Sequence, residues 1–435
     1  MIAGNRLANK TKIGYSAFNC GESGAYNLFY TYFLLFMTDF AGVNPAVGGT
    51  IALIAVLWDG VTDAVIGYFS DRSTNPNGRR RPFMSRFMVP FAIMLVLIFA
   101  DFGLTGPAQV AFYVIMNILF WLFFTLTDVP AITLGGEITD DPEEKRSIRS
   151  WATIMNYLGF LLATAFAPQM VTRFNDAFNA ANPSFGWTAT AACFAALLLI
   201  CYIIAVVSTK GCEKPLTKEE AEKTSNGSLF SSMFAPLKVK PFVGLWLYCL
   251  IFQAAVFLCT STLIYVIFYV CNGTENTATV VFLLYGVATI ILSPIMDRVA
   301  RKINNKKGIV GAMILMGGLE VIFGLTVFNT VTLVIMMLCG VAVGMSAYYV
   351  LAYTMVYDVA EVASLKLGKD SSTGAGTFIA FFQCAQKIGG AIGMWFAGIM
   401  LSFYKYDPNN ITEYTVNGIR FIATTLPGIV CIVSG

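Results

Sequence analysis

The chain has 435 residues, of which 57% are hydrophobic and only 12% are charged. This composition excludes an ordinary soluble protein and is typical of a chain that crosses a membrane many times. Histidine is absent, which excludes histidine-based catalysis, histidine metal ligands and histidine proton relays, so proton chemistry would have to use carboxylates.

Apolar segments of membrane-spanning length follow one another along the whole sequence. They predict an all-α integral membrane protein with twelve transmembrane helices. The last segment is short for a full span, so we expect the final helix to be incomplete. The predicted helices are 14–38, 47–69, 83–100, 109–131, 151–171, 188–208, 241–271, 277–296, 309–328, 332–357, 373–404 and 417–435.

The distribution of Lys and Arg between these segments predicts their orientation. With the N-terminus inside the cell, the inner segments hold twenty-four of the 28 basic residues and the outer ones only three. Positive residues gather on the cytoplasmic side of membrane proteins. We therefore expect a multi-pass protein of the cell's inner (plasma) membrane with a cytoplasmic N-terminus.

The one long polar stretch, 209–240, divides the chain into an N-terminal bundle (1–208) and a C-terminal bundle (241–435), with a cytoplasmic linker between them. The halves also share a repeat. Asp71-Arg72 follows the second predicted helix and Asp297-Arg298 follows the eighth, each before a basic cluster. Parallel six-helix halves are typical of the major facilitator architecture. We expect these four residues to act as a gate, or alternatively to fix topology and solubility only.

The second predicted helix contains two carboxylates at membrane depth, Asp59 and Asp63. Four residues apart, they project from one helix face, and Thr62 lies beside them. Two close carboxylates in a medium of low dielectric cannot both stay charged and unpartnered. Interhelical salt bridges are one explanation. A coupling-cation site is the other, and it is favoured because this helix has no Lys or Arg before Arg72.

Further polar residues lie inside the predicted helices, where charged groups usually face a bundle interior or a water-filled cavity. A single Asn or Gln is explained equally well by an interhelical hydrogen bond, whereas Asp128 and Lys387 favour a functional role. Aromatic rings beside hydroxyl-binding groups suit a sugar. The candidate substrate-binding residues are Asn19, Glu22, Ser23, Tyr26, Trp121, Asp128, Arg149, Tyr349, Gln383 and Lys387.

The motifs WDGVTDAVIG (58–67), FTLTDVP (124–130), RRPF (80–83), YYVLAYTMVYD (348–358) and AQKIGGAIG (385–393) occur in five of these regions. Together they resemble the glycoside–pentoside–hexuronide:cation symporter family, the melibiose permease-like branch of the major facilitator superfamily. The resemblance covers nearly the whole chain. It implies that Asp59 and Asp63 hold Na⁺, H⁺ or Li⁺ with help from Thr125, and that Asp128 and Lys387 bind sugar.

The sequence departs from the family pattern in the sugar pocket. Ser23, next to Glu22, occupies the position of a sugar-binding aspartate, and Ile132 and Tyr349 each replace a tryptophan. The family's sugar-binding arginine falls near Ala152, one turn from Arg149. The resemblance therefore implies a conserved type of cation site and a different substrate, such as a β-glycoside, a pentoside or a uronide.

These observations predict a secondary symporter that couples entry of Na⁺ or H⁺ to uptake of a sugar or glycoside by alternating access. It would act as a monomer in the bilayer, with no cofactor beyond the coupling cation, no nucleic-acid partner and no enzymatic activity. One alternative is a lysolipid or amphiphile symporter of the same fold. A second is a non-transporting membrane sensor or transferase, for which the sequence offers no nucleophile motif.

Overall fold

A computed structural model describes residues 7–71, 73–139, 141–213, 235–326, 328–367 and 375–435. These residues form helices joined by short connections, and no strand occurs among them. Ten of the described helices are long and apolar enough to cross a membrane. The other two predicted segments, 14–38 and 83–100, are helical as well; the first is rich in polar residues and the second gives a helix of only 17 residues. The prediction of an all-α membrane protein is confirmed.

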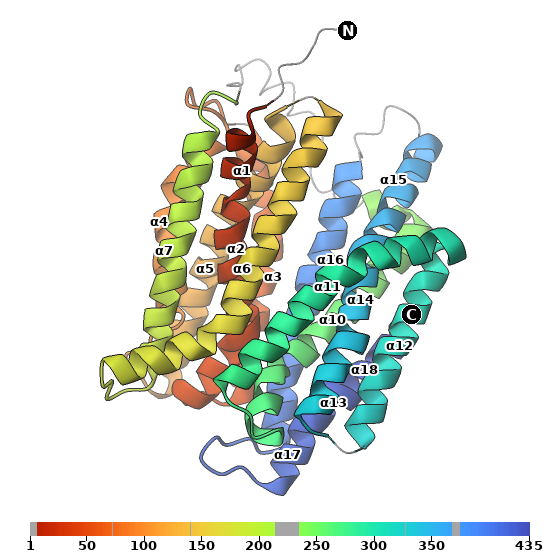
Figure 1. Ribbon diagram of the computed structural model, residues 1–435. Coiled ribbons are helices and arrows are strands. Elements are labelled where there is room, and N and C mark those ends of the chain that lie inside the picture. The colour runs from red at the N-terminus through yellow and green to blue at the C-terminus, as the bar shows by residue number, and fades with distance from the viewer. Residues whose placement is uncertain (1–6, 72, 140, 214–234, 327, 368–374) are drawn as a thin grey trace. The chain divides into compact units, whose positions relative to one another are not determined.

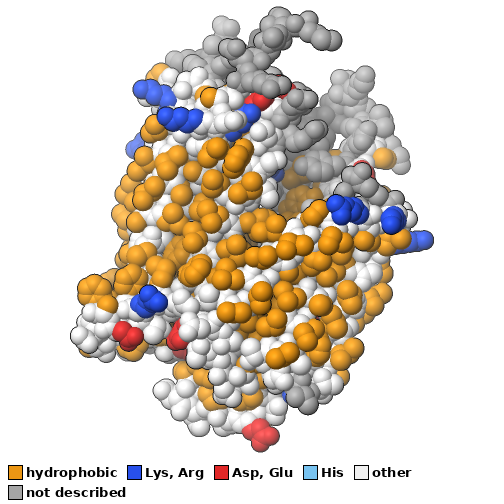
Figure 2. Space-filling view, viewed as in Figure 1, with side chains coloured by type: hydrophobic (Ala, Val, Ile, Leu, Met, Phe, Trp, Pro, Cys, Tyr) orange, Lys and Arg blue, Asp and Glu red, His pale blue; other side chains and the backbone are white. Residues whose placement is uncertain are grey.

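The chain separates into two compact units. Unit 1 comprises residues 1–36 and 54–226, and unit 2 comprises residues 37–53 and 227–435. The predicted helix at 47–69 thus contributes its first turns to unit 2 and its remainder to unit 1. Most of the predicted linker, from 214 to 234, lies outside the described residues, so the linker stays a prediction. Figure 2 shows apolar side chains spread along the helices, with most of the visible charged groups near helix ends.

Unit 1 is built from long helices, several of which continue beyond the predicted spans. α2 packs against α6 and α7, and α4 packs against α5 and α7 (Figure 1). At one crossing the backbone of Gly159 lies so close to Cys20 that a side chain larger than hydrogen would collide with its carbonyl group. The helices of this unit are α1 (Asn9–Ser16), α2 (Phe18–Leu35), α3 (Pro45–Asp71, from residue 54), α4 (Arg81–Leu97), α5 (Gly106–Glu137), α6 (Pro142–Ala177) and α7 (Ser184–Ser208).

Unit 2 contains several helices interrupted by π-helical turns. The predicted helix at 332–357 is built from five pieces, two of them π-helical. Such turns insert a residue into the helix and change which side chains share a face. Its elements are η2 (Ala235–Lys238), α10 (Lys240–Tyr265), η3 (Val266–Val270), α11 (Glu275–Ile303), α12 (Asn305–Leu325), α13 (Thr330–Ile335), η4 (Met336–Val341), α14 (Ala342–Ala347), η5 (Tyr348–Ala352), α15 (Tyr353–Leu367), α16 (Ala375–Phe403), α17 (Glu413–Arg420), η6 (Phe421–Thr425) and α18 (Leu426–Ser434).

Residues 37–53 are attached to unit 2 by a group of hydroxyl contacts to Asp39, which lies in the short π-helical segment η1 (Phe36–Phe40). The Asp39 carboxylate accepts hydrogen bonds from Thr38 Oγ1 at 2.6 Å, Tyr406 OH at 2.7 Å and Tyr269 OH at 2.8 Å. Burial raises the pKa of the Asp39 carboxyl group, and these hydrogen bonds oppose the rise. Asp39 therefore connects a segment between the first two predicted helices to η3 and to the loop after α16, both in the other half of the sequence.

Candidate cation and substrate sites

Two long helices of unit 1 carry the predicted cation ligands. α3 has no interruption between Asp59 and Asp63, so the two carboxylates lie one turn apart on the same face. α5 carries Thr125 in the middle of its 32 residues. Asp59 and Thr125 are completely buried, and Asp63 is half-buried. The three side chains therefore lie within the interior of the unit, away from the helix ends.

The side chains of these three residues converge. Thr125 Oγ1 lies 2.5 Å from Asp59 Oδ1 and 3.1 Å from Asp63 Oδ1. A threonine hydroxyl has one hydrogen and can donate it to one oxygen at a time. The hydroxyl hydrogen therefore cannot bond to both carboxylates at once. A shared proton or a monovalent cation between the carboxylates would remove the repulsion between them.

Thr62, the fourth predicted cation ligand, is also buried. Its hydroxyl group donates a hydrogen bond to the backbone carbonyl of Asp59, at 3.0 Å, within α3. The hydroxyl oxygen retains acceptor capacity while it donates. The donor set is thus made of hard oxygen atoms, which suit a proton or an alkali cation. The described residues contain no cluster of three or more Asp, Glu, Cys or His side chains arranged to hold a metal.

Asp128 lies one turn after Thr125 on α5 and is nearly fully buried. It interacts electrostatically with the phenol groups of Tyr15 and Tyr202. Arg149 also interacts with Tyr15, and Glu22 interacts with Tyr202. Three predicted substrate-binding residues, Asp128, Arg149 and Glu22, therefore lie within electrostatic range of two tyrosines that the sequence analysis did not select.

The other predicted substrate residues of unit 1 contact their own helix or the aromatic core. Asn19 donates to the carbonyl of Ser16 at 3.2 Å, and Ser23 accepts from Asn27 at 3.1 Å. Tyr26 stacks at a tilt on Tyr30, with ring centroids 4.5 Å apart. Trp121 is completely buried among the rings of Phe29, Phe120, Tyr30 and Tyr26. In this conformation Trp121 belongs to the core, and a role in binding substrate stays a prediction.

The remaining predicted substrate residues, Lys387, Gln383 and Tyr349, belong to unit 2. All three are at least partly exposed, and Tyr349 stacks on Tyr353. Gln386, the neighbour of Lys387, accepts hydrogen bonds from Tyr348 at 3.1 Å and Tyr353 at 3.4 Å. The amide of Gln386 is thus held by two phenols, and Lys387 follows it on the same helix, α16.

The side chains of three predicted gating residues, Asp71, Arg72 and Asp297, lie outside the described part of the structure, and Arg298 is exposed on α11. The neighbouring basic cluster is described. Arg79 pairs with Glu137 at 2.7 Å, and the buried Arg80 contacts Glu137 at 3.1 Å and Ser70 at 2.6 Å. These pairs lie within unit 1. The role of the cluster as a gate stays a prediction.

Sequence reasoning missed Glu213, which lies just after α7 in the predicted linker. Its carboxylate accepts hydrogen bonds from the backbone N–H groups of Arg80 and Arg81, at the start of α4. A carboxylate at a helix N-terminus satisfies unpaired N–H groups and complements the helix dipole. No motif signals this contact, because the two partners are more than 130 residues apart.

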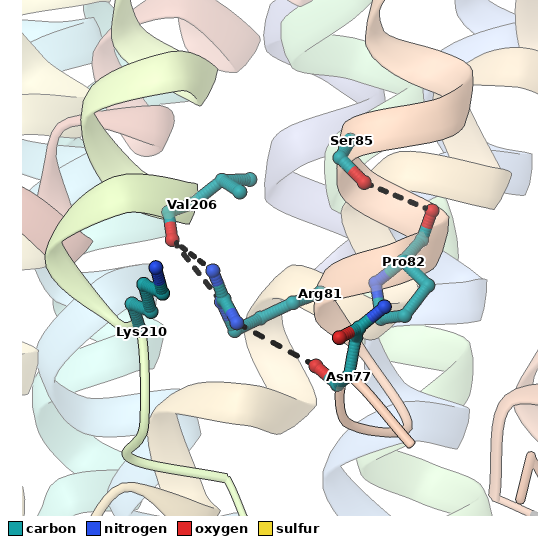
Figure 3. Close-up of a pocket in the computed structure, with 6 residues that line it drawn as sticks. All are labelled: Asn77, Arg81, Pro82, Ser85, Val206 and Lys210. Carbon is teal, nitrogen blue, oxygen red and sulfur yellow. Dashed lines mark hydrogen bonds between the residues drawn. The ribbon is translucent and has the colours of Figure 1, made fainter. Parts of the chain in front are cut away.

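A shallow hollow lies beside this contact, between α4 and α7, and is lined by Asn77, Arg81, Pro82, Ser85, Val206 and Lys210 (Figure 3). The Arg81 guanidinium donates to the carbonyl of Val206 from Nε at 3.1 Å and from Nη2 at 2.8 Å. A third contact, at 3.5 Å, reaches the carbonyl of Asn77. These hydrogen bonds of Arg81 therefore connect the start of α4 to the end of α7.

Comparison with known proteins assigns the chain to a family. A family model described as MFS/sugar transport protein matches residues 14–435. The chain belongs to this MFS sugar transport family. Like the family's other members it is a membrane transporter and not an enzyme, which confirms two predictions from the sequence.

Individual relatives agree with this assignment. The chain is 24% identical to the uncharacterized symporter YnaJ of Bacillus subtilis (strain 168) over 431 residues, covering 97% of this chain and 89% of the other. It is 30% identical over 169 residues to the putative glycoside/cation symporter YagG of Escherichia coli (strain K12), covering 38% of this chain and 36% of the other.

The fold of this MFS protein resembles that of a D-xylose–proton symporter. The TM-score is 0.65 at 15% sequence identity, over 97% of this chain and 95% of the other. At this identity the similarity shows a shared fold. The predicted major facilitator architecture is therefore confirmed.

Proposed function

We propose that this protein is a cation-coupled symporter that carries a sugar or glycoside across the membrane by alternating access. The observation that carries the proposal is the convergence of Asp59 and Asp63 on the hydroxyl group of Thr125. In the interior of a membrane protein such a pair of carboxylates needs a positive charge to become stable. The MFS relatives named as symporters support the same reading.

The cation would neutralise the two carboxylates of α3 and so allow α3 to pack closely against α5. Without it, the repulsion between Asp59 and Asp63 opposes close packing of the two helices. With it, the two carboxylates and Thr125 form one compact, hydrogen-bonded group. The conformation that binds substrate best would then be stabilised by the cation, and linkage requires that substrate strengthen cation binding by the same factor. Na⁺ and H⁺ are both compatible with these oxygen ligands.

The substrate would bind near Asp128. A ligand with many hydroxyl groups suits such a site, because each hydroxyl can donate a hydrogen bond to a carboxylate and accept one from a guanidinium group. Asp128, Glu22 and Arg149 offer such partners in unit 1. A lysolipid would require an apolar slot in their place. We propose a glycoside, pentoside or uronide as substrate. In unit 2, Lys387, Tyr349 and Gln383 are the proposed substrate-binding residues.

The distribution of basic residues supports a cytoplasmic N-terminus in the inner membrane. In this orientation the predicted gating residues Asp71, Arg72, Asp297 and Arg298 would lie at the inner face. Opposite charges there could close that face while the outer face is open. The proposal treats the protein as a monomer, since each chain contains both halves of the fold.

The test is transport by the purified protein in sealed vesicles. A panel of labelled glycosides, pentosides and uronides, with a lysolipid as comparison, would be offered with a Na⁺ gradient, a pH gradient or no gradient. We expect accumulation of one sugar class with one of the two gradients. Accumulation of lysolipid, or equal uptake with and without gradients, would contradict the proposal.

A further inference from the structure

An acidic side chain is completely buried in the centre of unit 2. Glu320 lies on α12, in a segment that is otherwise apolar, and neither of its carboxyl oxygens has a hydrogen-bond partner in the described structure. It lies in the other unit from the Asp59–Asp63 pair. Asp59 and Asp63 share a threonine hydroxyl, whereas Glu320 has no such contact. The burial of the Glu320 carboxyl group therefore needs an explanation that differs from that of the pair in unit 1.

The surroundings of Glu320 are tightly packed. α12 crosses α18 at Gly317 and Gly428, where an added Cβ atom on either glycine would collide with the carbonyl oxygen of the other. An added Cβ on Gly428 would also lie 2.9 Å from the Cβ atom of Glu320. Glu320 is one turn from Gly317, on the face that meets α18. The close crossing keeps water away from the carboxyl group.

No Lys or Arg among the described residues forms an ion pair with Glu320. The thiols of Cys259 on α10 and Cys431 on α18 interact with it electrostatically, and Tyr248 on α10 contacts Met313 of α12. On η4, Cys339 is exposed. The guanidinium of Arg420 donates to the carbonyls of Phe323 and Thr326 near the end of α12. η6 and α14 carry no ionisable side chain, and η5 touches α12 near Gly308, more than three turns from Glu320.

A carboxylate in these surroundings would be a buried charge without a counter-ion, which is far more costly than a buried neutral acid. We propose that Glu320 is a proton-binding site in the C-terminal half, separate from the Asp59–Asp63–Thr125 site. The proton stays on Glu320 while α12 and α18 are in contact at their glycine crossing. Release of the proton to water requires the two helices to separate.

Infrared spectroscopy of the purified protein in lipid tests this proposal without any substrate. A protonated carboxyl group has a carbonyl stretch distinct from that of a carboxylate. At pH 8 we expect this band in the wild-type protein and, at the same intensity, in Glu413→Gln, a control at an exposed glutamate. Glu320→Gln should remove the part of the band that comes from Glu320, whether or not the Asp59–Asp63 pair also holds a proton. A wild-type protein without the band, or an unchanged band in Glu320→Gln, would overturn the proposal.

Two further measurements keep the test decisive if Glu320→Gln does not fold. Glutamate labelled with ¹³C at its side-chain carboxyl must shift the band in the wild-type protein, since an aspartic acid would not respond; an unshifted band overturns the proposal. Gly317→Ala should separate α12 from α18 and abolish the ¹³C-shifted glutamate band at pH 8, whereas Gly318→Ala, where a Cβ atom meets open space, should keep it. A full band in Gly317→Ala would show that the crossing does not hold the proton.

Discussion

The two units place their buried carboxyl groups in opposite environments. In unit 1, Asp59 and Asp63 share a hydroxyl, and Asp128 lies among tyrosines, all on long α-helices. In unit 2, Glu320 is packed between helices without a hydrogen bond, and the polar contacts involve phenols and amides near π-helical turns. In our proposals, a cation would reach the pair in unit 1 at the partly exposed Asp63, whereas unit 2 would have to open before Glu320 could release its proton.

The largest expected effect comes from removing one carboxylate of the pair in unit 1. Asp59→Asn or Asp63→Asn should abolish cation-driven accumulation, because one remaining carboxylate no longer requires a cation to relieve repulsion. Exchange of substrate down its gradient should persist. The measurement is uptake in vesicles with and without the driving gradient, with Asp407→Asn, at an exposed loop residue, as the control. A mutant that still concentrates substrate would remove its residue from the cation site.

A smaller loss is expected for Asp128→Asn. Each charged hydrogen bond to a sugar hydroxyl contributes roughly 1.5–3 kcal/mol, so substrate affinity should fall at least about tenfold. Cation binding should change less, since Thr125 and the Asp59–Asp63 pair are retained. Calorimetric titration with substrate and with cation separates the two effects. Equal losses in both affinities would show that Asp128 belongs to the cation site instead.

The sequence predicted the site in unit 1 better than that in unit 2 for a physical reason. α3 and α5 are regular between the residues of interest, so spacing alone predicts which side chains share a face. In unit 2, η5 inserts a π-helical turn at Tyr348–Ala352, and Tyr348 and Tyr353 both reach Gln386. Residues five apart point in different directions on an α-helix and meet only where a π turn intervenes.

Of the features that the sequence analysis did not identify, one could have been predicted from the sequence and two could not. Glu320 lies in an apolar segment and could have been selected by the argument that identified Asp59. The hydrogen bonds of Asp39 to Tyr269 and Tyr406 could not have been predicted, because they join residues more than 200 positions apart without a shared motif. The cap that Glu213 provides to α4 could not have been predicted either, because no motif links the two partners.

The contacts of Asp39 offer a test of how firmly residues 37–53 belong to unit 2. Tyr406→Phe removes a hydrogen bond to a partly buried carboxylate and should lower the free energy of unfolding by about 1.5–3 kcal/mol. Tyr269→Phe should cost less, because its phenol group is less buried, and Tyr414→Phe, at an exposed tyrosine, should have no effect. Thermal unfolding of the three variants in detergent shows whether their stabilities follow this order. Equal stability of Tyr406→Phe and Tyr414→Phe would contradict the role assigned to Asp39.

The smallest effect is expected from the ion pairs at the start of α4. Glu137→Gln removes the negative charge that Arg79 and Arg80 contact. The Arg79 and Glu137 side chains are 23% and 24% exposed, so their ion pair should contribute only about 0–1 kcal/mol. Arg80 retains its bond to Ser70. Because these pairs lie within unit 1, Glu137→Gln should leave the balance between inward-open and outward-open conformations unchanged.

Asp71→Asn and Arg72→Gln provide the contrast, because these residues were predicted from the repeat to act as a gate. Each should shift the population towards the inward-open conformation and lower the affinity for substrate offered from outside. Spectroscopic distances across the inner face report the shift. If Glu137→Gln moves those distances as far as Asp71→Asn does, the ion pairs at the start of α4 belong to the gate. If none of the three variants moves them, the charges serve topology and solubility only.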